Sequence, residues 1–275
     1  MKEISYLIAD RETTMTSLLS AFFGEYAGHP PERELPPVAQ ACGEENALKA
    51  YKKQIANTLV DFVICSYKLT PGLGVDLAKK IRAITPGQPI IMISGKEFGF
   101  DELPQRDRVQ REIEQYADAY LQQPFKFDVF KNCIDGVQML YTRPRRLDIL
   151  VVDSCKYTQE ALAATFAVGN HKTSHVTLNV FGLSQTSTQS ADVVVLKFEP
   201  KELAQAQEIL SRFKEQSNVP VMVIVPETWT GQADAVYKTQ NMEAVDLLRC
   251  AHRLVNAKEE TPDQHALRYG FSRAI

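Results

Sequence analysis

The sequence is short of the features that would place it in several large classes of protein. It has one tryptophan and five cysteines in 275 residues, and the cysteines form no Cys-x-x-Cys pair. No apolar run approaches the ~18 residues that a membrane-spanning helix requires. The net charge is −3, from 31 basic and 34 acidic residues without a long basic run. We therefore expect no nucleic-acid interface, no membrane span, and buried free thiols in a cytoplasmic protein.

Short apolar runs alternate with segments of helical periodicity. The apolar runs are near-continuous, which is typical of parallel strands covered on both faces, and the clearest of them span 6–9, 62–65 and 90–93. Segments with an apolar stripe at helical spacing span 13–26, 43–54 and 75–84. This order predicts a doubly wound parallel α/β sheet, with its functional site at the carboxyl ends of the strands.

The pattern then occurs a second time. "ISYLIADRETTMTSLLSAFF" (4–23) parallels "LDILVVDSCKYTQEALAATF" (147–166), which places Asp10 opposite Asp153. Three later pairs of segments also correspond: 61–66 with 192–197, 89–94 with 220–225, and 117–123 with 233–239. The second copy is the shorter. We expect a domain at 1–142, a trimmed second copy at 143–258, and a tail at 259–275.

The segments at the strand ends of the first copy resemble a known family. They are Asp10 after the first strand, "ACGEENAL" (41–48), "SYKLTPGLG" (66–74), Ser94, and "DAYLQQPF" (118–125). In this order they resemble the receiver domains of bacterial two-component response regulators. The resemblance implies two tandem flavodoxin-like (βα)5 receiver domains, the second of them trimmed, and a cis peptide bond before Pro124.

The resemblance also implies a phosphorylation site that this chain has largely lost. A working receiver holds Mg²⁺ with carboxylates, phosphorylates an aspartate, and sets a lysine against the phosphoryl charge. The first copy keeps Asp10 but has Arg11 beside it, Ser66 at the acceptor position and Gln123 in place of the lysine.

The second copy has lost the same chemistry. It keeps Asp153 but has Ser154 beside it, Lys197 at the acceptor position and Thr239 in place of the lysine. For both copies we expect no catalytic residue, no metal ion and no cofactor, and therefore no enzymatic activity.

Several positions allow two interpretations. Ser66 is either a small residue tolerated in a retired pocket or a serine with its own phosphorylation chemistry. Arg11 either pairs with Asp10, in the volume that a metal ion would fill, or points to solvent. Ser94 and Tyr120 either keep the family's conformational switch, or act as a cap and a packing residue.

Three further segments carry weaker signals. "HKTSH" sets His171 and His175 four residues apart. No acidic or thiolate side chain lies nearby in the sequence, so a metal site is not expected. The insertion at 96–116 is interpreted as extra cover for the sheet, with a partner-binding flap as the alternative. The tail after Lys258 is expected to fray, with a docking peptide as the alternative.

The sequence thus favours a signalling adaptor or scaffold that works through protein contacts without phosphorylation. Its expected partner is a protein, namely a sensor kinase, another regulator or a localisation factor, and self-association is a further expectation. The resemblance implies a partner face on the fourth helix, fifth strand and fifth helix of the first copy, where Arg111, Tyr116, Lys126 and Lys131 suit a moderately polar interface. The alternative is a sensor that binds a small ligand or second messenger in a vacated pocket.

Overall fold

The computed structural model describes residues 4–28, 39–95, 103–142, 146–168, 171–178, 190–239 and 243–269. The chain divides into two compact units, which we describe separately. Unit 1 comprises Met1–Arg82, Gln88–Met139 and Glu260–Ile275, and unit 2 comprises Ala83–Gly87 and Leu140–Glu259. The C-terminal segment is therefore part of unit 1. None of the described helices is both long enough and apolar enough to cross a bilayer.

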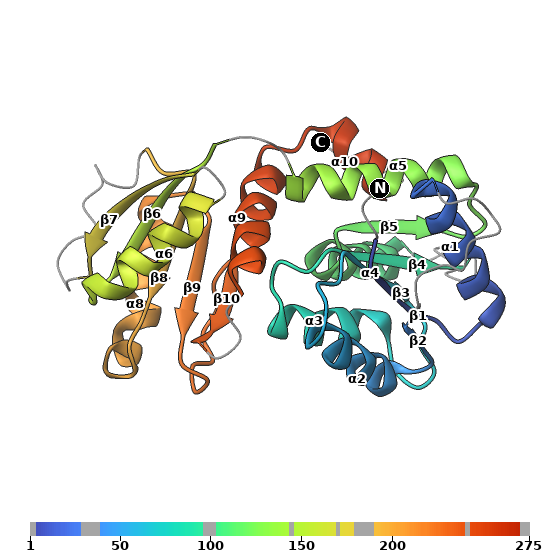
Figure 1. Cartoon of the computed structure of the whole chain (residues 1–275), viewed down its shortest axis with the longest axis horizontal. Coiled ribbons are helices and arrows are strands. Elements are labelled where there is room, and N and C mark those ends of the chain that lie inside the picture. Colours follow the sequence, from blue (N-terminus) through green and yellow to red (C-terminus); the bar gives the residue numbers. More distant parts are fainter. Residues whose placement is uncertain are drawn as a thin grey trace. The chain divides into compact units, whose positions relative to one another are not determined.

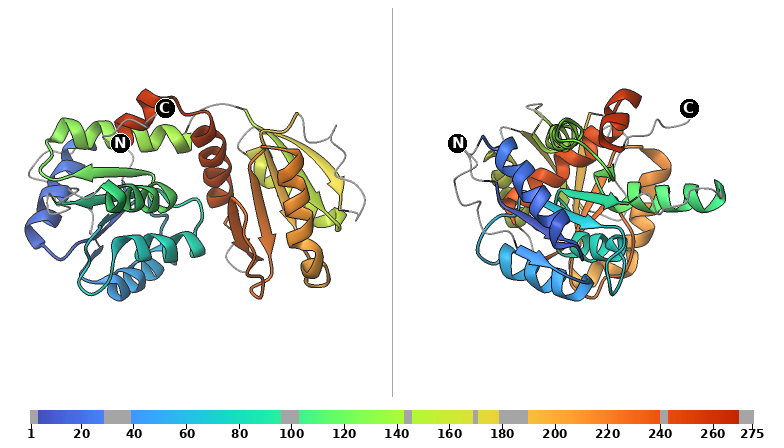
Figure 2. Two further views of the ribbon diagram at one scale, coloured as in Figure 1. Left: turned by 180° about the vertical axis from the view of Figure 1, so that it is seen from behind. Right: turned by 90° about the vertical axis from the view of Figure 1, so that its right-hand side faces the viewer.

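Unit 1 is a five-stranded parallel sheet with the order β2-β1-β3-β4-β5. Its strands are β1 (Tyr6–Ala9), β2 (Ala39–Ala41), β3 (Phe62–Ser66), β4 (Ile90–Ser94) and β5 (Ala119–Gln122). Its helices are α1 (Thr13–Tyr26), α2 (Glu44–Ile55), α3 (Gly74–Ile84), α4 (Leu103–Tyr116), α5 (Phe127–Thr142) and α10 (Pro262–Tyr269). Figures 1 and 2 show α1 and α5 on one face of the sheet, with α2 and α3 on the other.

Burial on both faces explains why these strands read as continuous apolar runs. Every residue of β1 and β4 is buried, as is every residue of β3 except Ser66. On the α1 side, Phe23 stacks on Tyr6 and packs edge-on against Phe130 of α5. Burial of such aromatic side chains contributes roughly 1.5–3 kcal/mol each to stability.

Unit 2 repeats the topology with the sheet order β10-β9-β8-β6-β7. Its strands are β6 (Asp148–Asp153), β7 (Lys172–Thr177), β8 (Val193–Lys197), β9 (Val221–Val225) and β10 (Ala235–Lys238). Its helices are α6 (Lys156–Val168), the 3-10 turn η1 (Pro200–Glu202), α8 (Leu203–Gln216) and α9 (Ala244–Lys258). The predicted pair of flavodoxin-like sheets is confirmed.

The trimming of the second copy is visible between β9 and β10. Residues 226–234 are all described and contain no helix, although α4 fills the corresponding stretch of unit 1. Trp229 from this connection is only 7% exposed and joins the apolar cluster formed by α8 with one face of the sheet. The indole therefore covers sheet surface that a helix would otherwise bury.

The cysteines only partly follow the prediction of buried thiols. Cys65, Cys133 and Cys250 are buried, and burial raises the pKa of Cys65 and Cys133 to about 12. Cys42 is exposed and Cys155 is partly exposed. For these two the prediction was wrong, because each lies in the turn that follows a strand rather than within a core-facing element.

Candidate functional site

The residues singled out in the first copy meet at one edge of its sheet. Asp10 follows β1, Ser66 ends β3 and Ser94 ends β4, and Gln123 follows β5. All these strands are parallel, so their carboxyl ends lie together. The sequence therefore located this edge of the sheet correctly.

Asp10 is buried, whereas Arg11 lies at the rim. The Asp10 carboxylate accepts a hydrogen bond from the backbone N–H of Glu12 at 2.8 Å. Burial raises the pKa of Asp10 above its ordinary value, outweighing the opposite effect of that bond. The Arg11 guanidinium is half-exposed and lies 3.5 Å from the Glu12 carboxylate. Within the described part of the chain no ion pair joins Arg11 to Asp10, so the idea of a guanidinium neutralising Asp10 is not what the structure shows.

Ser94 and Tyr120 contact each other directly. Their hydroxyl oxygens are 2.9 Å apart, and both side chains are buried. The Ser94 hydroxyl also donates to the carbonyl of Gly95 at 3.1 Å. The N–H of Gln123 donates to the Ser94 carbonyl, and the Gln123–Pro124 peptide is cis, as the resemblance implied. The two switch-like residues thus form one hydrogen-bonded unit.

At the equivalent edge of unit 2, a lysine side chain lies beside the buried acid. Asp153 is fully buried and accepts bonds from the Cys155 N–H, at 2.8 Å, and from the Thr158 hydroxyl. The Lys197 ammonium lies 3.6 Å from Asp153 and also bonds to Glu199. Burial alone would lower the pKa of Lys197. The opposite effect of Glu199 and Asp153 is larger, so the pKa is raised above its ordinary value and the lysine stays charged. An internal cation therefore neutralises the remaining acid, beside a half-buried Ser154.

A second lysine closes the same edge of unit 2. Lys238, at the end of β10, donates to the carbonyls of Pro226, Glu227 and Trp229 at 3.3, 3.2 and 2.5 Å. Sequence comparison set Thr239 against the family's lysine and missed the residue before it. These bonds from Lys238 hold the helix-free connection between β9 and β10 in place. In the described residues no cluster of three or more His, Cys, Asp or Glu side chains is suited to a metal ion.

The residues assigned to a partner face lie on α4, on α5 and, for Lys126, immediately before α5 in unit 1. Arg111, Lys126 and Lys131 are exposed, and Lys131 pairs with Asp135 on the next turn of α5 at 2.7 Å. Tyr116 is half-buried and its ring lies 6.0 Å from the Lys79 ammonium. Residues 96–102 of the insertion lie outside the described residues, and the rest of the insertion, 103–116, is α4 itself.

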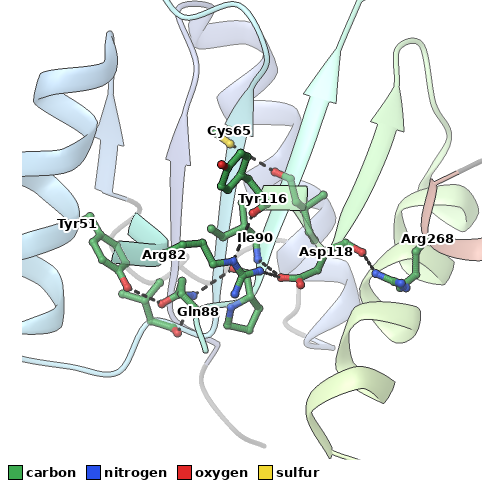
Figure 3. Close-up of polar contacts among 11 residues, drawn as sticks. Tyr51, Cys65, Arg82, Gln88, Ile90, Tyr116, Asp118 and Arg268 are labelled. Atoms are coloured by element: carbon green, nitrogen blue, oxygen red, sulfur yellow. Dashed lines mark hydrogen bonds and ion pairs between the residues drawn. The ribbon is translucent and has the colours of Figure 1, made fainter. Parts of the chain in front are cut away.

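A buried polar network of unit 1 lies at the opposite, amino-terminal edge of the sheet (Figure 3). Asp118 is 2% exposed, and its carboxylate accepts from the Arg82 guanidinium at 2.6 Å and from the Ile90 N–H at 2.8 Å. The Asp118 carbonyl accepts from Arg268. Beside this network, Gln88 accepts from the Tyr51 hydroxyl and donates to the Val60 carbonyl.

Sequence reasoning used Asp118 in the family resemblance and in aligning the two copies but gave it no structural role, although "ADA" occurs at both 117–119 and 233–235. In unit 2 the corresponding Asp234 also accepts from a strand N–H, that of Val221 at 2.7 Å, and pairs with Lys214 at 2.5 Å. Both copies thus tie the start of their last strand to its neighbour through an aspartate and a cation. Only in unit 1 is that ion pair buried.

The chain's last described segment docks on unit 1 instead of fraying. Helix α10 lies against β5, and Arg268 is 5% exposed. Its guanidinium makes two bonds to the Glu260 carboxylate, at 2.6 and 2.5 Å. His265 is buried, with its ring nitrogen 3.7 Å from Glu114 of α4. The expectation of fraying was wrong for these residues, because a buried arginine anchors them.

His171 meets a different histidine from the one that the sequence suggested. Its ring packs edge-on against His252 of α9, with centroids 4.8 Å apart, whereas His175 is exposed on β7. The Nδ1 atom of His171 accepts the Leu147 N–H at 3.1 Å, which leaves the proton on Nε2. With Nδ1 occupied by this bond and Nε2 carrying the proton, neither nitrogen of His171 is available to a metal ion. The pair of histidines is a packing contact.

Acid is expected to destabilise unit 2 through this histidine pair. Burial lowers the pKa of His171, and burial together with His171 lowers that of His252 from 6.5 to about 4. The unfolded chain therefore binds more protons than the folded chain in this pH range. The free energy of unfolding keeps its full contribution from the pair above pH ~6.5 and falls as the pH drops toward ~4. Fluorescence of Trp229 in urea at several pH values measures the loss. A His252→Gln variant should lose clearly less stability across this window, and an equal loss would contradict the assignment.

The chain was compared with known proteins by sequence and by structure, and the similar solved structures include response regulators. Neither a protein-family model nor a curated relative matches the sequence. A response regulator receiver domain protein from Clostridium thermocellum is 20% identical, with a TM-score of 0.39 over 49% of this chain and 93% of that one. A putative response regulator from Chloroflexus aurantiacus is 24% identical, with a TM-score of 0.38 over 50% of this chain and 98% of that one.

One further similarity extends over more of the chain. NtrX from Brucella abortus is 15% identical, with a TM-score of 0.38 over 84% of this chain and 62% of that one. The fold itself stands on the strand order and parallel register of the two sheets. The chain is therefore similar to response regulator receiver domains, in two successive copies whose carboxyl edges carry Asp10 with Ser66 and Asp153 with Lys197.

Proposed function

We propose that this protein is a signalling adaptor that acts through protein contacts and accepts no phosphoryl group. The observation that carries the proposal is the Lys197 ammonium, which lies against Asp153 where a receiver would hold its metal ion and its acceptor carboxylate. In unit 1 the acceptor position is Ser66, and the neighbouring Arg11 is paired with Glu12. At each edge a basic side chain pairs with a carboxylate that a hard divalent cation would otherwise use.

The contacts of Ser94 and Tyr120 support a role for unit 1 in recognition. A hydrogen-bonded pair of buried hydroxyls joins Ser94, at the carboxyl end of β4, to Tyr120 in the edge strand β5. Arg111 of α4, Lys126 just before α5, and Lys131 of α5 are exposed. Arginine and aromatic residues commonly supply the binding energy of protein interfaces. The expected partner is a sensor kinase, another regulator or a localisation factor, and self-association uses the same face.

The runner-up, a small-ligand sensor, has less support. A described cavity of about 340 Å³ lies in unit 2, beside Pro220 at the start of β9 and Lys214 of α8. It is therefore at the amino-terminal edge of the sheet, away from the carboxyl-end pocket in which doubly wound sheets bind their ligands.

The purified protein is expected to gain no phosphoryl mass when incubated with acetyl phosphate and Mg²⁺. The reason is the missing nucleophile and the missing second metal ligand. Intact-mass spectrometry measures the outcome. The matched control is the triple variant Arg11→Asp, Ser66→Asp and Gln123→Lys, which should acquire acid-stable Mg²⁺-dependent phosphate only if these three side chains are what unit 1 lacks. A phosphorylated wild-type chain would overturn the proposal.

A further inference from the structure

Helix α10 is held by docking and not by its own helical tendency. It has eight residues, and isolated helices shorter than ~12 residues are marginal in water. Arg268 anchors it through an ion pair with Glu260 that is almost fully buried, and among the described side chains His265 is buried as well. Buried ion pairs contribute specificity more readily than net stability, because desolvation offsets much of their attraction. Docking of α10 therefore selects for an arginine but does not require a high affinity.

Unit 1 supplies a socket of matching shape and polarity for this arginine. Gly136 of α5 lies beside the arginine, and a Cβ atom there would come within 3.0 Å of the Arg268 side chain. The Asp118 carbonyl, at the start of β5, accepts the guanidinium. In Figure 3 the arginine reaches Asp118 from the side opposite Arg82. Glu114 of α4, 22% exposed, supplies negative charge beside His265. Three elements, α4, β5 and α5, thus contribute to one helix-binding face.

We propose that this face is a binding site for an arginine-bearing helix, that α10 occupies it within the chain, and that a partner protein's helix of the same kind displaces α10. The occupant is specified by the socket. It needs a guanidinium for the Asp118 carbonyl, a carboxylate of its own in the role of Glu260, and a close approach over Gly136. Lysine lacks the planar fork with which Arg268 bonds both oxygens of Glu260.

This inference deepens the proposed adaptor function and rests on it. It identifies the partner's chemistry and adds a resident competitor for the partner face. A competitor in the same chain lowers the apparent affinity of a partner by the fraction of time that the socket is open. Exposed Lys126 and Lys131 remain available for first encounter while the socket is filled.

The test uses a labelled peptide with the sequence of residues 259–269 as probe, and full-length proteins as receptors. Arg268→Ala protein, whose own α10 has lost its anchor, should bind the peptide at least ~10-fold more tightly than wild type does. A peptide with the same Arg→Ala change should bind that protein at least ~10-fold more weakly than the native peptide. Arg268→Ala, Gly136→Leu protein should not bind, because its socket is filled. Circular dichroism checks that each receptor is folded.

A second measurement needs no variant. In wild-type protein, amide hydrogen exchange in α10 should be at least ~10-fold faster than in β4, because α10 opens without global unfolding. Equal exchange in α10 and β4 would overturn the proposal. Equal peptide binding by wild-type and Arg268→Ala proteins, or binding by neither, would also overturn it. A wild-type dimer that exchanges α10 between copies would place a second copy, and not a partner, in the socket. The peptide assay involves no phosphate, so its failure is separate from failure of the phosphorylation test.

Discussion

Replacement of Asp118 by alanine is expected to lower the free energy of unfolding of unit 1 by about 3–5 kcal/mol. The carboxylate is almost fully buried and accepts from both the Arg82 guanidinium and the Ile90 N–H. Its removal leaves a guanidinium that is 10% exposed without this partner, together with a buried strand N–H. An uncompensated buried charge is among the most costly single defects in a protein.

The second copy provides the control for this prediction. Asp234→Ala removes the equivalent carboxylate, which also bonds a strand N–H but pairs with a lysine that is 45% exposed. Solvent screens that pair, so we expect a loss of only about 1–2 kcal/mol. Equal losses for Asp118→Ala and Asp234→Ala would show that burial of the ion pair is not the cause.

The chain's single tryptophan allows the two effects to be measured separately. Trp229 lies in the core of unit 2, so its fluorescence reports the unfolding of that unit, whereas far-ultraviolet circular dichroism reports both. Asp118→Ala should shift the dichroism transition in urea while the fluorescence transition stays close to that of wild type. Asp234→Ala should shift the fluorescence transition.

Replacement of Lys197 by methionine is expected to destabilise unit 2 by about 2–4 kcal/mol at neutral pH. Methionine preserves most of the side-chain volume but leaves Asp153, which is fully buried, without its neighbouring cation. The Cys155 N–H and the Thr158 hydroxyl still bond to Asp153, which limits the loss. Fluorescence of Trp229 in urea measures the change.

A double variant separates neutralisation of Asp153 from simple packing by Lys197. Asp153→Asn with Lys197→Met removes both charges and should recover at least half of the stability lost by Lys197→Met. If the double variant is no more stable than the single one, the lysine acts through packing and not through its charge. Lys214→Met, at an exposed ion pair in the same unit, should change stability by about 1 kcal/mol or less.

The elements of the fold were predictable because each has a local signal. The predicted strand at 6–9 and helix at 13–26 match β1 and α1 residue for residue, since their buried faces are continuous in the sequence. The internal repeat located both carboxyl edges, because the carboxyl ends of parallel strands meet at one edge. For the same reason, the sequence alone was enough to assign Asp10, Ser66 and Ser94 to one edge of the first sheet.

The contacts among these residues were not predictable, because they depend on side-chain direction. Nothing in the sequence says that Arg11 pairs with Glu12 and not with Asp10, or that Lys197 turns to Asp153. The pairing of His171 with His252 joins elements far apart in the chain, whereas the sequence showed only the near neighbour His175. The docking of α10 was hidden for a related reason. An eight-residue segment with mixed polarity has no strong helical signal, and its anchor, Arg268, is 150 residues from Asp118.

The return of α10 to unit 1 also has a consequence for synthesis on the ribosome. Translation produces the strands of unit 1 first, then Leu140–Glu259 of unit 2, and only afterwards the segment that fills the socket beside Gly136. At roughly 5–20 residues per second, the intervening stretch takes on the order of ten seconds to make. During that interval a nascent chain presents an open socket, so each molecule is accessible to an arginine-bearing helix once during its synthesis, before its own α10 exists.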